Sequence, residues 1–404
     1  MVVDRQMSVV DAATPEWVNT ELFANLLSKE VADFQKILKF STKRVDNCKD
    51  NYLGVKIEYE AKDGKRRVMG FILKTATFSS GDKFLPYLNN STLAQENDVN
   101  FEILPKFRKL YEEENTPINF APMVYKFPQP VPEDYILFED LQYKGYRCIQ
   151  QSGGLSSKQM EIALKNLAAF HAASVVGAKF DIKSRRTFCN ATKETQILAD
   201  RIFYENLRGY SLKHYEDKIK SLQTQFLENR PFSNQQEFQV LLLGNANLDN
   251  MLFQIDAFGN IKDFVFTNLG SCSYGNPAKD LWYLLLSSTN LDEKLNKFEY
   301  YVKFYYDQLI GCFKLLKYKG DVPKLSELHY DLLKNNKWAF EAVTQVLPLA
   351  LWDPIQDCAV SADCSADPCE RNDRLLKVMY GQENYCQQIQ KLLPWMENKA
   401  LLEV

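Results

Sequence analysis

Apolar and polar segments alternate regularly in the C-terminal half of the chain. A short apolar run at residues 240–243 is followed by the polar turn 244–250, with the sequence GNANLDN. Apolar segments at 251–255 and 261–266 then flank a turn that contains Gly259, a residue type that readily adopts turn conformations. This order predicts a short strand, a polar loop and a β-hairpin.

A second polar loop follows this hairpin at residues 268–276, and an apolar helix is expected to start at Asp280. Because the hairpin connects this loop to the polar turn 244–250, we expect the two loops to lie side by side. Their polar side chains make them the first candidates for a functional site.

Strand patterns also occupy the N-terminal part of the chain. The Asp63-Gly64 pair is a strong hairpin-turn signal, and apolar residues alternate on both sides of it: Val55, Ile57, Tyr59, Met69, Phe71 and Leu73. Two more strands are predicted at 123–127 and 135–138. These segments predict an antiparallel sheet.

Two helices are predicted around these strands. The first has Thr14 as its N-cap and Pro15 as its first helical residue. The second covers residues 91–104, carries Glu96, and should end at Pro105, because proline cannot donate the backbone hydrogen bond that a helix interior needs.

Helical patterns dominate the rest of the chain. Ser156 and Gln159 form a capping box at the start of one helix, which continues into the sequence LAAFHAAS around His171. A lone histidine on an apolar helix face is more often a hydrogen-bonded core residue than a catalyst. Further helical segments are predicted at 189–239, 295–317, 325–333, 338–347 and 385–396.

These patterns predict an α+β fold with two lobes, a small antiparallel β-sheet lobe followed by a mainly helical lobe. We place an N-terminal helical extension at residues 1–34, the sheet lobe at 35–140 and the helical lobe at 141–404. The length of 404 residues is sufficient for two substantial cores.

The charge of the chain limits its partners. There are 49 basic and 52 acidic residues, a net charge of −3, which gives no sign of a nucleic-acid partner. The N-terminal sequence lacks the basic start and apolar core of a signal peptide, and no apolar run is long enough to span a membrane. We therefore expect a cytoplasmic protein that does not bind membranes.

Nine cysteines are dispersed through the chain, which suits reduced thiols better than a disulfide framework. Cys358, Cys364 and Cys369 form the one cluster. Because this cluster contains neither a CxxC motif nor a nearby histidine, we do not expect it to bind metal.

The order and spacing of these motifs resemble small-molecule kinases of the protein-kinase-like superfamily, the choline and aminoglycoside kinases and most closely the insect ecdysteroid-kinase-like family. In that family the first loop normally reads His-Gly-Asp with an Asn five residues after the Asp, and the second loop opens Asp-Phe-Gln. Gly244 and Asn250 match this pattern, as does the downstream Asp280.

The resemblance covers about residues 35–350 and assigns further roles. It makes Lys74 and Glu96 an ion pair that orients the lysine onto nucleotide phosphates, and Glu139-Asp140-Leu141 the hinge that meets adenine. Asn51 matches the phosphate-covering loop, where Lys49 replaces the usual glycine. His171 is structural in the family.

The catalytic positions depart from the family pattern. Leu243 replaces the histidine, Asn245 replaces the catalytic Asp, and Asn268 replaces the metal-binding Asp. The family uses ATP and Mg²⁺, but asparagine is a poor base and Mg²⁺ prefers anionic oxygens, so Asn250 and Asn268 predict a weak or absent metal site.

Three functions therefore remain open. The substitutions favour a pseudokinase that acts as a binding or regulatory protein, with a protein or a small lipophilic molecule as its partner. An active ATP-dependent kinase that phosphorylates a hydroxyl of a steroid-like acceptor is the first alternative, and it needs an unrecognised carboxylate. A carrier that holds a lipophilic molecule in the acceptor pocket is the second.

Overall fold

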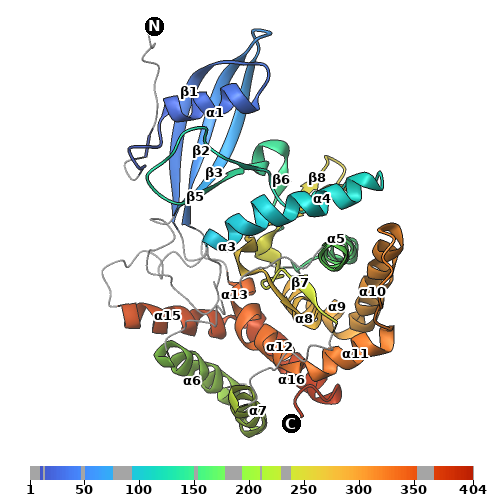
Figure 1. The fold of residues 1–404 in the computed structure, drawn as a ribbon. Coiled ribbons are helices and arrows are strands. Elements are labelled where there is room, and N and C mark those ends of the chain that lie inside the picture. The colour runs from blue at the N-terminus through green and yellow to red at the C-terminus, as the bar shows by residue number, and fades with distance from the viewer. Residues whose placement is uncertain are drawn as a thin grey trace.

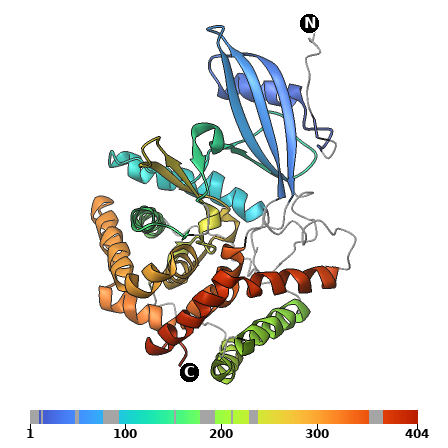
Figure 2. The same ribbon diagram turned by 180° about the vertical axis from the view of Figure 1, so that it is seen from behind.

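A computed structural model of the chain describes residues 10–11, 14–46, 51–75, 93–149, 153–177, 193–209, 212–228, 238–352 and 368–403. The chain forms a sheet-rich N-terminal lobe and a larger helical lobe, which Figures 1 and 2 show from opposite sides. The predicted two-lobed α+β fold is confirmed.

The N-terminal lobe is built on a five-stranded antiparallel sheet with the order β1-β2-β3-β5-β4. Its strands are β1 (Phe34–Asp46), β2 (Asn51–Ala61), β3 (Arg66–Thr75), β4 (Val124–Tyr125) and β5 (Tyr135–Glu139). As predicted, β2 and β3 form a hairpin, in which Leu53 lies opposite Leu73.

Helix α1 (Thr20–Glu30) packs across one face of this sheet (Figure 1). Phe23 on α1 contacts the rings of Phe40 and Phe71, and all three side chains are buried. Because side chains alternate along a strand, Lys74, next to the buried Leu73, projects from the opposite face.

The expected helix start at Thr14 is wrong. The helix begins after Asn19, whose side chain accepts a hydrogen bond from the Leu22 N–H and so provides the better cap.

A long helical segment connects β3 to the second half of the sheet. It consists of α3 (Leu93–Asp98), a π-helical turn (Val99–Ile103) and α4 (Leu104–Glu113). The expectation that Pro105 ends this helix is wrong, because Pro105 lies in the first turn of α4. The helical segment continues because the π turn places Pro105 in the first turn of α4. Backbone N–H groups in the first turn of a helix have no partner within that helix, so the missing N–H of proline costs nothing there.

The helical lobe contains two small sheets, with the orders β6-β8-β9 and β10-β7. The hairpin strands β8 (Met251–Ile255) and β9 (Ile261–Phe266) have the predicted bounds. The other strands are short, namely β6 (Tyr146–Arg147), β7 (Val240–Leu242) and β10 (Ser273–Gly275).

Helices pack around these sheets into one large core. The helices are α5 (Ser157–Val176), α6 (Lys193–Gly209), α7 (Glu216–Glu228), α8 (Ala278–Ser288), α9 (Leu291–Asn296), α10 (Phe298–Leu315), α11 (Leu325–Lys334), α12 (Asn336–Glu341), a π turn (Ala342–Val346), α13 (Leu347–Leu351), α15 (Pro368–Gly381) and α16 (Glu383–Asn398). Short 3-10 turns lie at Leu141–Lys144, Lys213–Tyr215, Leu248–Asn250 and Leu269–Ser271. The predicted helix 295–317 corresponds to α10, which begins at Phe298, because the separate helix α9 ends at Asn296. Among the described residues, no helix is both long and apolar enough to cross a membrane.

Candidate functional site

The buried carboxylate of Asp280 holds the start of the first polar loop. Asp280 lies in the first turn of α8 and is fully buried. Its two oxygens accept hydrogen bonds from the backbone N–H groups of Leu243 at 2.6 Å and Gly244 at 3.0 Å. Hydrogen bonds to a buried charged group are strong, so Asp280 fixes the path of the chain as it leaves β7.

His171 on α5 connects this carboxylate to the core. Its Nε2 lies 3.2 Å from Asp280, and its Nδ1 lies 2.7 Å from the Tyr305 hydroxyl on α10. The imidazole is fully buried between these two groups. The structural interpretation of His171 therefore agrees with its position, because both ring nitrogens already have partners within the protein.

The two polar loops touch at Gly244. Its backbone has a φ of +76°, a left-handed conformation that glycine adopts without strain. A Cβ at this position would lie 2.2 Å from the Ser271 carbonyl oxygen in the second loop. Glycine is therefore required both by the turn and by the close approach of the loops. The two loops lie side by side, as expected from the hairpin between them.

Neutral amides occupy positions 245 and 268, where the resemblance to the family implies carboxylates, and Asn250 contacts both residues. Asn250 donates a hydrogen bond to the Asn245 carbonyl oxygen at 2.9 Å, and Asn268 donates to the Asn250 side chain at 3.4 Å. The Asn245 side chain itself accepts a hydrogen bond from Asn247 at 2.6 Å. The structure thus brings Asn250 and Asn268 together as expected, while Asn245 points its amide oxygen to its own loop.

The backbone at Asn268 explains which residues this position tolerates. Its φ of 58° and ψ of 52° lie in the left-handed region, where asparagine and aspartate are favoured over other residues that carry a side chain. An Asp-to-Asn replacement therefore keeps the loop conformation and removes only the charge.

One nearby carboxylate has another partner, since Asp263 on β9 accepts a hydrogen bond from the Tyr146 hydroxyl at 2.5 Å. Asp249 lies in the turn that Asn247 caps, where its backbone N–H donates to the Asn247 side chain at 3.0 Å. Three neutral amides without an added carboxylate are a poor donor set for Mg²⁺, which is a hard cation and binds anionic oxygens. These three amides by themselves therefore do not fit the Mg²⁺ that the resemblance to the family implies.

The N-terminal lobe, in contrast, keeps its charged pair. Lys74 Nζ lies 3.2 Å from the Glu96 carboxylate, which is only 2% exposed. The sheet supplies the lysine and α3 supplies the glutamate. The predicted contact between the two residues is present, although its predicted role in nucleotide binding remains untested.

The glutamate helix also contacts the second loop of the other lobe. The side chain of Gln95 donates a hydrogen bond to the Cys272 carbonyl oxygen. Burial raises the pKa of the Cys272 thiol, and the nearby Asp280 and Glu96 carboxylates raise it further. The charged pair, the second loop and Asp280 therefore lie close together. Sequence reasoning missed Gln95 and Cys272, because a single glutamine or cysteine at these positions carries no motif.

The segment Glu139-Asp140-Leu141 joins the end of β5 to the 3-10 turn Leu141–Lys144. The Glu139 and Asp140 N–H groups donate to Met123 and Gly70, at 2.8 Å and 2.9 Å, so both are used within the protein. The Glu139 side chain pairs with Lys144 at 2.6 Å. The contact of this segment with adenine stays a prediction.

For several residues singled out in the sequence, the structure describes the backbone alone or nothing. Asn51 is the first residue of β2, and its backbone pairs with Asp46. Lys49 lies outside the described residues, as do Cys358 and Cys364. Within the described ranges, no group of three or more histidine, cysteine, aspartate or glutamate side chains is arranged to hold a metal ion.

The arrangement of sheet lobe, connecting segment, helical lobe and paired loops defines a kinase-like class of fold. The chain belongs to the ecdysteroid kinase-like family, whose model matches residues 45–318. Among curated proteins, none matches the sequence.

Solved structures with some similarity are aminoglycoside phosphotransferases. The APH(2")-IIa complex with gentamicin is 13% identical, with 92% of this chain and 96% of that chain covered and a TM-score of 0.36. ADP-bound APH(2'')-Ib is 12% identical, with coverages of 90% and 99% and a TM-score of 0.32. At these scores the similarities carry no argument about substrate.

Proposed function

We propose that this member of the ecdysteroid kinase-like family is catalytically impaired and acts as a binding or regulatory protein. The observation that carries the proposal is the amide cluster of Asn245, Asn250 and Asn268 at the family's catalytic and metal positions. Phosphoryl transfer needs a base for the acceptor hydroxyl and magnesium to neutralise the phosphates, and neutral amides supply neither.

The proposal leaves weak nucleotide binding intact. Lys74 offers a positive charge that Glu96 holds in place, so ATP has one strong electrostatic contact without metal. We expect ATP to bind weakly and almost independently of Mg²⁺. Losing a general base alone lowers the rate by about 10²–10⁴, and losing the metal lowers it further.

The carrier alternative gains little support from the aromatic residues of the C-terminal helices. Three of them, Tyr301, Tyr305 and Trp352, are at most 1% exposed and belong to the main core, whereas Tyr300 is 48% exposed. Side chains that fill a core do not leave space for a lipophilic ligand. An active kinase remains the alternative against which the proposal is tested.

The test is transfer of labelled phosphate from Mg·ATP to ecdysteroid, choline and aminoglycoside acceptors. We expect no transfer above a control without protein. Turnover by the unmodified protein that is lost in Lys74→Ala would overturn the proposal, because it would require a carboxylate that replaces Asn245.

A further inference from the structure

A cavity of about 160 Å³ lies in the helical lobe, and neither Lys74 nor Glu96 lines it. Its apolar wall consists of Leu248, Leu291, Ala350 and Leu351. Leu248 belongs to the first polar loop and is buried, so the cavity lies behind this loop of the candidate site. At about 30 Å³ for each water-sized volume, the space suits a molecule of roughly five to seven non-hydrogen atoms.

The opposite wall is polar and comes from α16. Asn384 and Gln388 both line the cavity, and the Gln388 amide donates to the Asn384 side chain at 3.0 Å. The other end of the Gln388 amide accepts a hydrogen bond from Lys294 Nζ at 2.5 Å. One hydrogen bond therefore separates the cavity wall from a lysine.

Lys294 is unusual because it is only 2% exposed and its ammonium contacts a neutral amide. A buried cation without an anionic partner is costly, since the protein interior solvates charge poorly. Burial alone lowers the pKa of Lys294 to about 7, and no carboxylate in the described residues opposes this shift. The charged lysine thus lacks a counter-charge.

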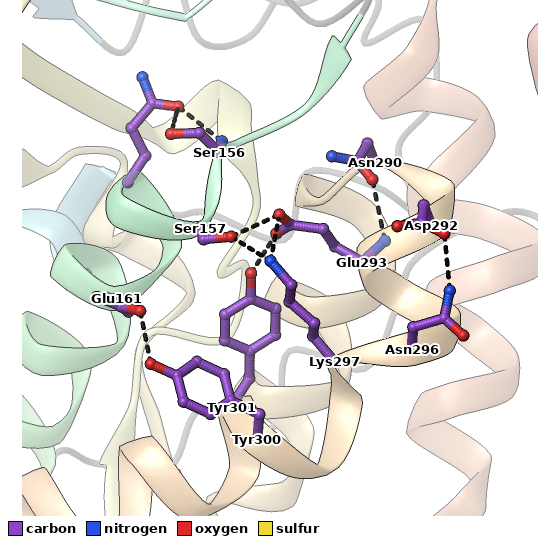
Figure 3. Close-up of polar contacts among 11 residues, drawn as sticks. Ser156, Ser157, Glu161, Asn290, Asp292, Glu293, Asn296, Lys297, Tyr300 and Tyr301 are labelled. Carbon is purple, nitrogen blue, oxygen red and sulfur yellow. Dashed lines mark hydrogen bonds and ion pairs between the residues drawn. The ribbon is translucent and has the colours of Figure 1, made fainter.

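Two carboxylates on the helices that carry Lys294 and Gln388 have other partners. Glu293, the neighbour of Lys294 on α9, accepts hydrogen bonds from Ser157, Lys297 and Tyr301 on the side that faces α5 (Figure 3). Glu383 on α16 accepts a hydrogen bond from Gln387 at 3.0 Å. Lys294 does not itself line the cavity. Its Nζ is linked to the cavity wall through the Gln388 amide, so a negative charge held in the cavity would lie one amide group away from the ammonium.

We propose that this cavity binds a small monocarboxylate, with its head group at the Asn384 and Gln388 amides, with Lys294 behind the Gln388 amide, and with its hydrocarbon part against the apolar wall. The amide groups donate hydrogen bonds, the lysine supplies the opposite charge, and the four apolar side chains favour a hydrocarbon tail over a second charge. The proposal does not depend on nucleotide binding or on the proposed loss of catalysis.

The experiment measures binding of butyrate to the purified full chain by calorimetry, with sodium chloride added to match ionic strength. We expect saturable binding at about pH 6 that weakens at about pH 8.5, because the lysine loses its proton between these values while the carboxylate stays charged. Inorganic phosphate at the same concentrations should bind at least about tenfold more weakly, since the apolar wall offers it nothing.

Two variants locate the binding. Lys294→Met removes the charge at similar volume, and Ala350→Leu fills the cavity while leaving the lysine in place. Each should weaken butyrate binding by about tenfold or more. Lys303→Met removes an exposed lysine on α10 that pairs with Asp307, and this matched control should bind butyrate like the unmodified protein.

Either of two results would overturn the proposal. The first is that butyrate has no saturable effect beyond that of sodium chloride. The second is that Lys294→Met and Ala350→Leu, both shown to be folded by near-ultraviolet circular dichroism, bind butyrate as tightly as Lys303→Met does. Phosphate binding as tight as butyrate binding would overturn the assignment of a carboxylate.

Discussion

The two halves of the candidate site differ in charge. In the N-terminal lobe, Lys74 and the buried Glu96 form an ion pair at 3.2 Å. In the helical lobe, the facing loops present Asn245, Asn250 and Asn268, whose side chains are all neutral. The half that would contact a phosphate keeps its charge, whereas the half that would hold a metal has lost it.

The buried residues behind the neutral loops, Asp280 and His171, nevertheless hold the first loop by hydrogen bonds. We call these residues and Gly244 the frame of the loops. Asp280 binds two backbone N–H groups of the first loop, His171 supports Asp280, and Gly244 allows the loops to touch. Loop geometry and loop charge are therefore separate properties of this fold. The first depends on buried groups behind the loops, and the second depends on two side chains that can change without strain.

The largest expected effect comes from removing the frame. Asp280→Ala leaves two buried N–H groups and His171 without their acceptor, and we expect it to lower the free energy of unfolding by about 3–5 kcal/mol. Urea unfolding followed by fluorescence measures this change. Asp307→Ala, at an exposed ion pair on α10, is the control and should change stability by less than about 1 kcal/mol. Equal effects of the two variants would show that Asp280 does not hold the loop.

A smaller effect is expected from breaking the charged half. Lys74→Met leaves the Glu96 carboxylate buried without its partner, which should reduce the free energy of unfolding by about 1–3 kcal/mol. It should also remove the weak ATP binding. Lys126→Met is the control, because Lys126 lies over the Phe101 ring and pairs with no carboxylate in the described structure. ATP binding that survives in Lys74→Met would mean that the nucleotide contacts some other group.

Restoring charge to the neutral half sharpens the comparison. Asn245→Asp combined with Asn268→Asp should create a hard-oxygen site, so that Mg²⁺ tightens ATP binding by at least about tenfold, or about 1.4 kcal/mol. The single changes should do much less, because residues of one site act together. Asn115→Asp is a matched control, since Asn115 also has a left-handed backbone, with φ of 54°, but lies at the end of α4. A double variant that behaves like this control would contradict the assignment of the loops.

The sequence predicted the β8–β9 hairpin and the contact between Lys74 and Glu96, because both follow from local patterns. The β8–β9 hairpin has the predicted bounds because alternating apolar residues and a glycine turn specify it locally. Lys74 and Glu96 meet because strand and helix place them on facing surfaces. The family motifs gave the positions of both loops.

Other features depend on tertiary contacts that no local pattern reveals. The π turn before Pro105 lets the helix continue, and a single-residue rule for proline could not anticipate it. Lys294 lies in the charged sequence LDEKLNK, which indicates a solvated helix, yet it is only 2% exposed and donates a hydrogen bond to Gln388 of α16. The bond between Gln95 and Cys272 likewise joins residues that are distant in the sequence.

The most direct test of the difference between the two halves is titration of the unmodified protein with ATP, with and without Mg²⁺. The charged Lys74–Glu96 pair and the neutral loops predict weak binding with dissociation constants that agree within about threefold in the two conditions, because the loops hold no metal. Tightening of tenfold or more on addition of Mg²⁺ would contradict this account, since it would show that the amide loops bind the metal after all.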